Sequence, residues 1–367
     1  MKKVNVGIIG CGNISEAYLN AAKVFPIIQI TACADINFDA AKAKADSHNI
    51  KAMSVEELLR TDDIEIILNL TTPQAHTEIN LKALNAGKNV HCEKPFALTR
   101  DDGKKVLNLA KEKGLLVGCA PDTFLGGGIQ TCRKIIDDDE IGKPIAGTAF
   151  MMCHGHESWH PNPGFYYLKG GGPLLDMGPY YITALINLLG PVKRVCALSA
   201  TPFKERIATS KELNGKVLPV EIPTHIAGTL EFQNDAIISM VMSFDVWHHS
   251  NHNIEIHGKK GSLQVPDPNC FGGPVKINKF GKNGWKEVSL SHGYTDNLRS
   301  IGVADMAYAL RYNRKNRCSG ELAYHVLDVM LSLNESAEKG TFINIESSVK
   351  QPAALPTELK NGELDAN

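Results

Sequence analysis

The chain has 367 residues, of which 43% are hydrophobic and 22% are charged, and its formal net charge is -1. This balance is typical of a globular protein with about two domains and excludes a nucleic-acid binder, which needs clustered Lys and Arg. The apolar runs are far shorter than the ~20 residues of a membrane-spanning helix. The nine cysteines are scattered without a C-x-x-C pair, which favours a cytoplasmic location over a disulfide framework.

Strand-like and helix-like segments alternate through the first third of the chain. We expect strands at 4–9, 27–34, 64–70, 89–92 and 115–119, and helices at 15–24, 38–48, 73–86 and 100–113. This alternation predicts an α/β domain of the Rossmann type, with a doubly wound and mostly parallel sheet, over residues 1–121.

Strands dominate the chain after Pro121. We expect them at 145–152, 192–200, 224–232, 237–244, 253–257, 262–265 and 275–280, with helices at 127–137, 174–189, 297–312 and 320–339. This pattern predicts an α+β domain with a large, mostly antiparallel open sheet over residues 122–350, followed by a polar and partly disordered tail at 351–367. An open sheet face needs a cover, so we expect the chain to self-associate.

A glycine motif follows the first predicted strand and opens the first predicted helix. It runs Gly10-Cys11-Gly12-Asn13-Ile14-Ser15 and matches G-x-G-x-x-G except at Ser15. Glycines let the backbone approach a pyrophosphate closely, and the helix N-terminus supplies N–H donors. We therefore predict that Gly10, Gly12, Asn13 and Ile14 bind a dinucleotide.

Asp35 ends the second predicted strand, roughly 20 residues beyond the glycine motif, where an acid binds the adenosine ribose. The alternative is that Asp35 caps the next helix, for which Asn37 is an equal candidate. Neither Ile36 nor Asn37 is a cation that could bind a ribose phosphate, so the sequence favours NAD and leaves NADP possible.

The end of the third strong strand supplies further cofactor contacts. Thr71, Thr72 and Pro73 follow it, and ligands bind beyond the carboxyl ends of parallel strands. His76 comes next, on the following helix. It is either a surface histidine or a residue near the nicotinamide, and we count it among the cofactor contacts.

Four motifs, spread over residues 4–345, resemble the glucose–fructose oxidoreductase / inositol dehydrogenase (Gfo/Idh/MocA) family. They are Gly10-Cys11-Gly12, Thr72-Pro73 with His76, Glu93-Lys94-Pro95, and the segment GGGPLLDMG at 170–178. The resemblance implies an NAD(P)-dependent oxidoreductase that moves a hydride between nicotinamide and a sugar, polyol or sugar derivative. It also implies a homodimer or homotetramer.

The resemblance gives catalytic roles to three residues. Lys94, which also belongs to the cofactor set with Glu93, would polarise the reacting oxygen, and Asp176 would align the substrate hydroxyl. Tyr180 stands where most members carry a His acid/base. It shares a face with Asp176 if the segment stays helical through Pro179. A phenol is a poor base at neutral pH unless a cation such as Lys94 lowers its pKa.

The segment 154–160 supplies rival proton carriers and aromatic surface for a sugar. With the junction between the domains, it gives the predicted substrate contacts: Asp122, Thr123, His154, His156, Trp159 and His160. Three histidines beside Glu157 also suggest a metal site, but spacing alone does not establish converging ligands, and we predict no metal.

Two other functions stay open. The resemblance admits a glycosidase that oxidises its sugar transiently and re-reduces it, with tightly held NAD and no net NADH. The missing His at Tyr180 allows a non-catalytic dinucleotide-binding regulatory protein. Intact Lys94 and Asp176 argue against the regulatory protein.

Overall fold

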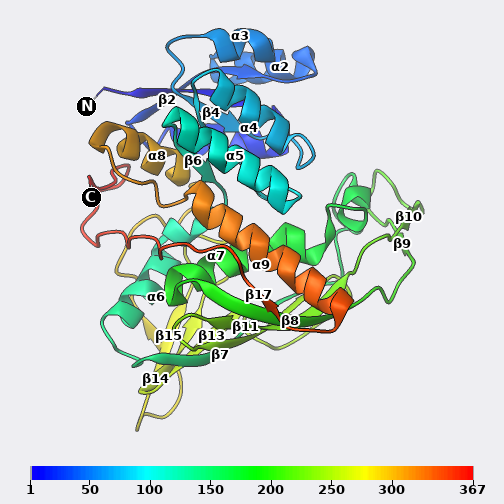
Figure 1. The fold of residues 1–367 in the computed structure, drawn as a ribbon, viewed down its shortest axis with the longest axis vertical. Coiled ribbons are helices and arrows are strands. Elements are labelled where there is room, and N and C mark those ends of the chain that lie inside the picture. The colour runs from blue at the N-terminus through cyan, green and yellow to red at the C-terminus, as the bar shows by residue number, and fades with distance from the viewer. Residues whose placement is uncertain (1, 367) are drawn as a thin grey trace.

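The computed structural model describes residues 2–366 and contains two large β-sheets of different construction (Figure 1). The first sheet has six strands in the order β3-β2-β1-β4-β5-β6, and every neighbouring pair is parallel. Its strands are β1 Val4–Ile9, β2 Ile28–Ala34, β3 Lys51–Ala52, β4 Ile66–Asn69, β5 Asn89–Cys92 and β6 Val117–Cys119. The predicted doubly wound sheet is confirmed, and its strand order reverses between β1 and β4.

Both faces of this sheet are covered. Ile66 and Leu68 of β4 belong to one hydrophobic core, whereas Ile67 between them belongs to another, so the strand is apolar throughout. The connecting helices are α1 Asn13–Ala22, α2 Phe38–His48, α3 Val55–Arg60, α4 His76–Asn85 and α5 Arg100–Lys113.

In the first domain, the two short elements β3 and α3 were not predicted from the sequence. The signal for α3 was present, because Ser54 and Glu57 form a capping box in which each side chain accepts a hydrogen bond from the other residue's backbone N–H. The short length of both elements hides any hydrophobic period.

The second sheet has nine strands in the order β16-β15-β14-β13-β7-β12-β11-β8-β17. Every neighbouring pair is antiparallel except β7 with β12, so the predicted mostly antiparallel sheet is confirmed. Its strands are β7 Pro144–Met152, β8 Val192–Ala200, β11 His225–Phe232, β12 Ile237–Ser243, β13 Ile254–Gly258, β14 Gly261–Val265, β15 Val275–Lys279, β16 Lys286–Val288 and β17 Ile343–Asn344. A separate hairpin, β9 Glu205–Ile207 with β10 Val217–Pro219, projects from the domain.

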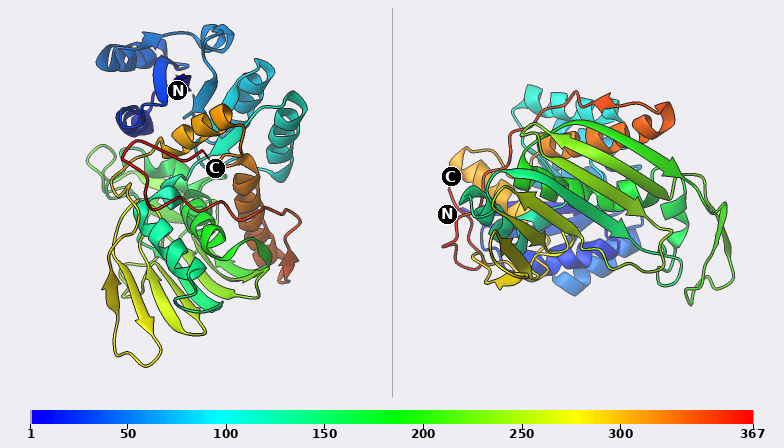
Figure 2. Two further views of the ribbon diagram at one scale, coloured as in Figure 1. Left: turned by 90° about the vertical axis from the view of Figure 1, so that its left-hand side faces the viewer. Right: turned by 90° about the horizontal axis from the view of Figure 1, so that it is seen from below.

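Helices lie on one face of the second sheet, and Figure 2 shows the strands of the opposite face from below. The covering helices are α6 Gly127–Asp137, α7 Gly172–Leu189 and α9 Gly320–Lys339, with short 3-10 turns at Thr123–Leu125 and Pro163–Tyr167. Helix α8, Ile301–Tyr312, packs instead against α1 and β6, and α9 also contacts α5. The two C-terminal helices therefore join the domains, and the predicted boundary at residue 121 stays a prediction.

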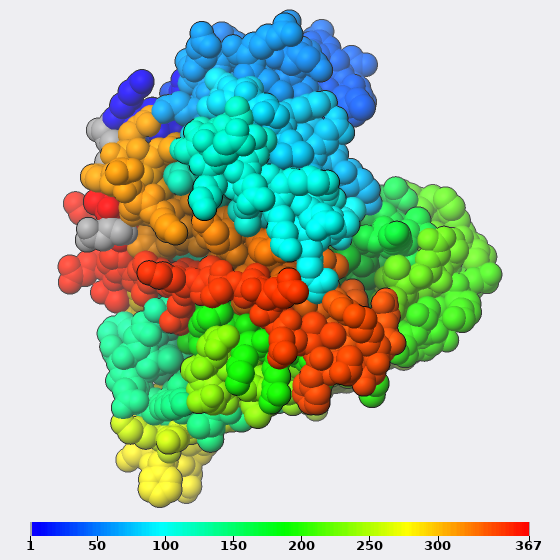
Figure 3. Space-filling model, in the orientation of Figure 1, coloured from blue at the N-terminus to red at the C-terminus, as the bar shows by residue number. Residues whose placement is uncertain are grey.

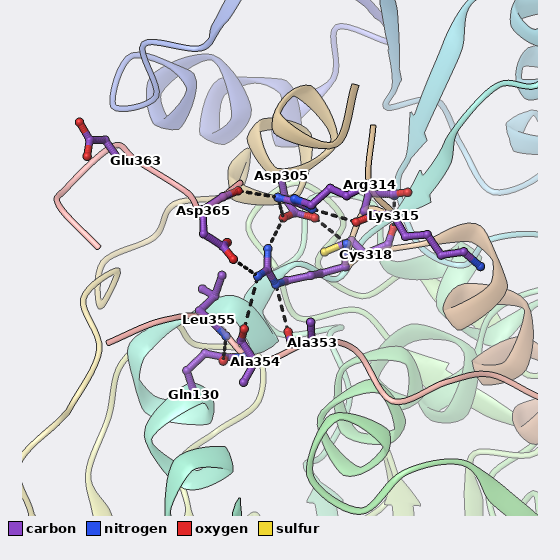
Figure 4. Close-up of polar contacts among 12 residues, drawn as sticks. Gln130, Asp305, Arg314, Lys315, Cys318, Ala353, Ala354, Leu355, Glu363 and Asp365 are labelled. Carbon is purple, nitrogen blue, oxygen red and sulfur yellow. Dashed lines mark hydrogen bonds and ion pairs between the residues drawn. The ribbon is translucent and has the colours of Figure 1, made fainter. Parts of the chain in front are cut away.

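The tail differs from the expectation of partial disorder. It has no helix or strand, but Leu355 and Leu364 are buried, and the Arg317 side chain donates to the carbonyls of Ala353 and Ala354 (Figure 4). Two well-placed leucines and fixed carbonyls are enough to hold a polar segment whose average composition suggests disorder. Figure 3 shows the tail, in red, crossing one face of the molecule. Residue 367, the last of the predicted tail, lies outside the described residues.

Within residues 2–366, no helix combines the length and the hydropathy that crossing a bilayer requires.

Candidate active site

The glycine motif turns between β1 and α1 and leaves the N-terminus of α1 open. Gly10 has φ +104°, and a Cβ there would lie 2.6 Å from the Leu70 carbonyl, so the loop presses against the end of β4. A Cβ at Gly12 would meet nothing within 4 Å among the described residues, and Gly12 offers no side chain to cap the helix. Ser15 is fully buried at the third motif position, and its hydroxyl donates to the Gly12 carbonyl over 2.6 Å. Open N–H groups at a helix N-terminus fit a pyrophosphate.

Asp35 lies directly beside this loop. Its Oδ2 accepts a hydrogen bond from the Cys11 N–H over 2.7 Å, and its Oδ1 accepts one from the Asn37 N–H over 2.8 Å. Asn37, not Asp35, caps α2, because its side chain accepts from Asp39 N. The capping alternative for Asp35 therefore fails, and its half-exposed carboxylate fits the predicted ribose contact.

The segment after β4 contributes to the cavity in a different way from the one expected. Thr71 and Pro73 line it, but the His76 side chain is fully buried. Its ring nitrogens lie 2.8 Å from the Pro95 carbonyl and 3.0 Å from the Thr71 carbonyl. Burial alone would lower the pKa of His76, but the Cys92 sulfur and these carbonyls raise it to about 9. His76 thus braces the two segments that line the cavity, which corrects the expectation of direct cofactor contact.

A cavity of about 440 Å³ opens between the two domains. The first domain supplies the residues expected near the nicotinamide, and the second supplies residues of α7 and of the segment 154–171. The side chains that line it include Ile14, Glu93, Lys94, His156, Trp159, Tyr166, Asp176, Tyr180, Asn269 and Arg299. Cofactor-side and substrate-side residues therefore face one space.

Lys94 and Asp176 meet inside this cavity. The Lys94 ammonium donates to Oδ1 of Asp176 over 2.8 Å and to the Asp176 carbonyl over 2.7 Å. The two side chains come from different domains, and each is less than one-fifth exposed. Lys94 follows β5, at the carboxyl end of the parallel sheet, and Asp176 lies in the second turn of α7.

The charges of this pair stabilise each other. Burial opposes both charges, but the Lys94 ammonium and the hydrogen bond from His156 lower the pKa of Asp176 to about 2. Likewise, burial alone would lower the pKa of Lys94, yet the Asp176 carboxylate raises it above its ordinary value. At neutral pH the cavity therefore holds an ammonium beside a carboxylate.

Tyr180 lies one turn of helix beyond Asp176. Helix α7 runs without a break through Pro179, so the two residues share a face, and the Lys94 ammonium lies 5.2 Å from the centre of the Tyr180 ring. Burial raises the pKa of Tyr180, whereas Lys94 and Arg299 both act to lower it. Two cations therefore oppose the effect of burial on this phenol.

Two residues at or behind the cavity wall, Tyr18 and Arg299, were not predicted from the sequence. The Tyr18 hydroxyl donates to Oε1 of Glu93 over 2.8 Å, and Oε2 of the same carboxylate accepts from the Lys94 N–H over 2.9 Å. Tyr18 is fully buried and positions Glu93 from α1. Nothing in the sequence pattern marked Tyr18, or Arg299 in the loop before α8, because only folding brings them to the cavity.

The predicted substrate contacts Asp122 and Thr123 are wrong. Both are about 1% exposed. Oδ2 of Asp122 accepts hydrogen bonds from the N–H groups of Ser300 and Gly302, and the Thr123 hydroxyl donates to the Pro268 carbonyl. Asp122 and Thr123 therefore hold the start of α8 and the loop at Pro268 by hydrogen bonds.

The three loop histidines separate in the structure. Nε2 of His156 lies 3.2 Å from Oδ2 of Asp176, so this histidine reaches the centre of the cavity. His154 instead stacks on Trp247 and lies 3.3 Å from Arg206, away from the cavity. The His160 ring packs edge-on against Tyr166, behind the lining. His154 and His160 are thus corrected as direct substrate contacts, and Trp159 lines the mouth, 61% exposed.

Within the part of the chain that the structure describes, no three His, Cys, Asp or Glu side chains gather closely enough to hold a metal ion.

Comparison with known proteins identifies the family to which this chain is similar. A family model described as an oxidoreductase family with an NAD-binding Rossmann fold matches residues 4–120, and the Gfo/Idh/MocA C-terminal domain model matches residues 129–264. The uncharacterised oxidoreductase YrbE of Bacillus subtilis is 22% identical over 95% of this chain and 98% of its own length. A levoglucosan dehydrogenase of Pseudarthrobacter phenanthrenivorans is 23% identical over 72% of this chain and 73% of its own length.

Two further comparisons agree. An inositol 2-dehydrogenase of Salmonella agona is 30% identical over 41% of this chain and 45% of its own length. The solved structure of a levoglucosan dehydrogenase in complex with NADH and L-sorbose has a TM-score of 0.82 at 21% identity, over 95% of this chain and 100% of that chain. The protein is therefore an NAD-binding oxidoreductase. It belongs to the Gfo/Idh/MocA family, as its motifs indicated.

Proposed function

We propose that the protein is an NAD-dependent dehydrogenase or reductase of a sugar or polyol, with Lys94, Asp176 and Tyr180 around the reacting hydroxyl. The observation that carries the proposal is the 2.8 Å contact between the Lys94 ammonium and the Asp176 carboxylate in one cavity. Relatives named as a levoglucosan dehydrogenase, a 1,5-anhydro-D-fructose reductase and an inositol 2-dehydrogenase support the substrate class.

The chain's own residues would then divide the work. The open N-terminus of α1 binds the dinucleotide phosphates, and Asp35 binds the adenosine ribose. When bound, the nicotinamide supplies or accepts the hydride. The Lys94 ammonium stabilises negative charge on the substrate oxygen, Asp176 orients the hydroxyl, and Tyr180 or His156 moves its proton.

Lys94→Met tests the proposal. Removing a preorganised cation from the reacting oxygen should lower kcat on the order of 10²–10³-fold, whereas the Kd for NADH, measured by fluorescence, should change little. Lys82→Met, on the exposed side of α4, is the matched control and should behave as wild type. Near-wild-type turnover by Lys94→Met would contradict the proposal. Steady NADH accumulation by the wild type separates a dehydrogenase from a glycosidase that oxidises its sugar transiently.

We also propose that the open face of the second sheet joins copies of this chain. A row of apolar residues crosses four neighbouring strands at one register, and none of them is fully covered: Leu198, Ala227, Val241 and Phe150. Leu198 is 74% exposed, and its neighbours Ala197 and Ile226 face the core. Light scattering should give a dimer or tetramer for the wild type and a smaller species for Leu198→Glu. A monomeric wild type at micromolar concentration would contradict this. The cytoplasmic location stays a prediction.

A further inference from the structure

Arg299 lies at one end of the cavity, in the loop before α8, without an ionic partner. Its Nη2 donates to Oδ1 of Asn269 over 2.7 Å, and its Nη1 donates to Oδ1 of Asn297 over 2.8 Å. Both acceptors are neutral amides, and no carboxylate oxygen of the described residues forms an ion pair with this guanidinium within 4 Å. By contrast, the buried Arg206 and Arg317 and the partly buried Arg314 each pair with a carboxylate: Glu157 for Arg206, and Asp305 for the other two.

The carboxylates near Arg299 form hydrogen bonds with other groups. Asp176 bonds to Lys94 and His156, and Glu93 accepts from the Tyr18 hydroxyl and the Lys94 N–H. Asp122 lies below, fully buried, with Oδ2 on two backbone N–H groups of α8. The guanidinium therefore faces the cavity without a contact ion pair, and the Asp122 carboxyl group acts on its charge only from a distance.

Further donors lie beside Arg299. Because Oδ1 of Asn269 faces the guanidinium, the Nδ2 amine of the same side chain is left as a donor, and Asn269 lines the cavity. The Tyr180 hydroxyl is near enough for Arg299 to influence its pKa. A partly buried cation with neighbouring donors and no ion-pair partner of its own is the environment that an anionic ligand group completes.

We propose that Arg299 and Asn269 form an anion subsite of the substrate cavity, and that the substrate is a sugar or polyol acid whose carboxylate binds there. The planar guanidinium matches a carboxylate, while the Lys94–Asp176 end receives the reacting hydroxyl. The inference rests on the proposed function for the identity of that hydroxyl. The dinucleotide phosphates are the other anion that could meet Arg299, since Ile14 lines the same cavity.

Matched acid and neutral ligands test the subsite. Calorimetric titrations in saturating NADH would compare D-galacturonate with D-galactose, D-glucuronate with D-glucose, and D-gluconate with D-glucitol. At least one acid should bind more tightly than its neutral partner. Arg299→Met should weaken the binding of that acid roughly 30-fold. It should leave the Kd values for the neutral ligand and for NADH within about threefold. Arg299→Lys should retain part of the preference for the acid. Arg60→Met, an exposed arginine at the end of α3, is the control and should bind all ligands as wild type.

The outcomes separate the sources of the anion. If no acid is preferred over its neutral partner, or if Arg299→Met keeps the preference, the subsite proposal is wrong. If Arg299→Met stays folded by circular dichroism but loses NADH affinity instead, the anion is a cofactor phosphate, which also overturns the proposal. Turnover is measured separately. If the protein oxidises neutral sugars and shows no preference for acids, only the subsite proposal is wrong. If acids bind through Arg299 but no hydride passes between nicotinamide and any sugar or sugar acid, only the proposed function is wrong.

Discussion

The surroundings of each titratable side chain in this protein decide its role more than its type does. His76 and His156 are both close to the cavity. The His76 ring lies between two backbone carbonyls and is fully buried, whereas Nε2 of His156 faces the Asp176 carboxylate. His156, beside Asp176, and Tyr180, beside Lys94, are therefore the two candidates for the proton carrier of the proposed reaction.

Tyr180→Phe and His156→Gln distinguish them. Tyr180→Phe keeps the ring under Lys94 but removes the acidic proton, so kcat for oxidation should fall on the order of 10²–10⁴-fold. His156→Gln should mainly raise KM, because Lys94 still holds Asp176. A base must be deprotonated to accept a proton, and burial raises the pKa of Tyr180, so the wild-type oxidation rate should rise toward alkaline pH. A pH–rate profile checks this, and full activity in Tyr180→Phe with loss in His156→Gln would assign the proton to His156.

The start of α8 depends on a carboxyl group from outside the helix. Asp122, which follows β6, accepts hydrogen bonds from the N–H groups of Ser300 and Gly302. These contacts satisfy backbone donors at the N-terminus of a helix that joins the domains. Burial raises the pKa of Asp122 from 3.8 to about 6, although the bonds to Gly302 and Ser300 and the charge of Arg299 oppose the rise. The helix therefore begins over a carboxyl group that titrates near neutrality.

This titration predicts a pH-dependent stability. A carboxyl group whose folded pKa is above its unfolded value stabilises the fold fully below pH 3.8, and that contribution is lost as pH rises through about 6. Asp122→Asn keeps an acceptor for both N–H groups without titrating. Between pH 4 and 7 the wild type should therefore lose roughly 2 kcal/mol of unfolding free energy relative to the variant, as measured by urea unfolding. Asp296→Asn, an exposed control, should follow the wild type. Equal pH slopes for Asp122→Asn and the wild type would contradict the argument.

A buried ionic cluster joins the tail to α8 and to the segment that follows α8. Arg317 forms ion pairs with Asp305 of α8 and with Asp365 of the tail, and Arg314 also pairs with Asp305. Figure 4 labels Asp305, Arg314 and Asp365. Asp305 is fully buried and bonds to both arginines. The tail continues to the first domain, where Gly362 lies against the Val24 carbonyl.

Asp305→Ala and Asp365→Ala should differ in their effect on the whole molecule. Asp305→Ala leaves two buried guanidinium groups without their shared carboxylate and should cost roughly 3–5 kcal/mol of unfolding free energy. Asp365→Ala should cost less, about 1–2 kcal/mol, because Arg317 keeps Asp305 and two carbonyls. Chemical unfolding at pH 7 measures both. A larger loss in Asp365→Ala would show that the tail, not α8, holds the cluster.

Elements with a clear period or clear caps were predictable from the sequence. The bounds of the helices Phe38–His48, Arg100–Lys113, Gly127–Asp137 and Gly320–Lys339 agree with the expected ones. The start of α4 was placed three residues too early, at Pro73, because the turn that precedes His76 has helix-compatible residues. Short strands such as β3 and β17 had no period to detect.

The sequence by itself determined the two kinds of sheet, the glycine loop and the family motifs that contain Lys94 and Asp176. Periodicity and turn chemistry act within single elements, and the family motifs are contiguous. The tertiary structure decided which histidine reaches the cavity, that Asp122 accepts from the N-terminus of α8 and that Arg299 lines the cavity. These features depend on burial and on pairs between positions that are distant in the sequence. Lys94 and Asp176, for example, are 82 positions apart. No local pattern encodes such a separation.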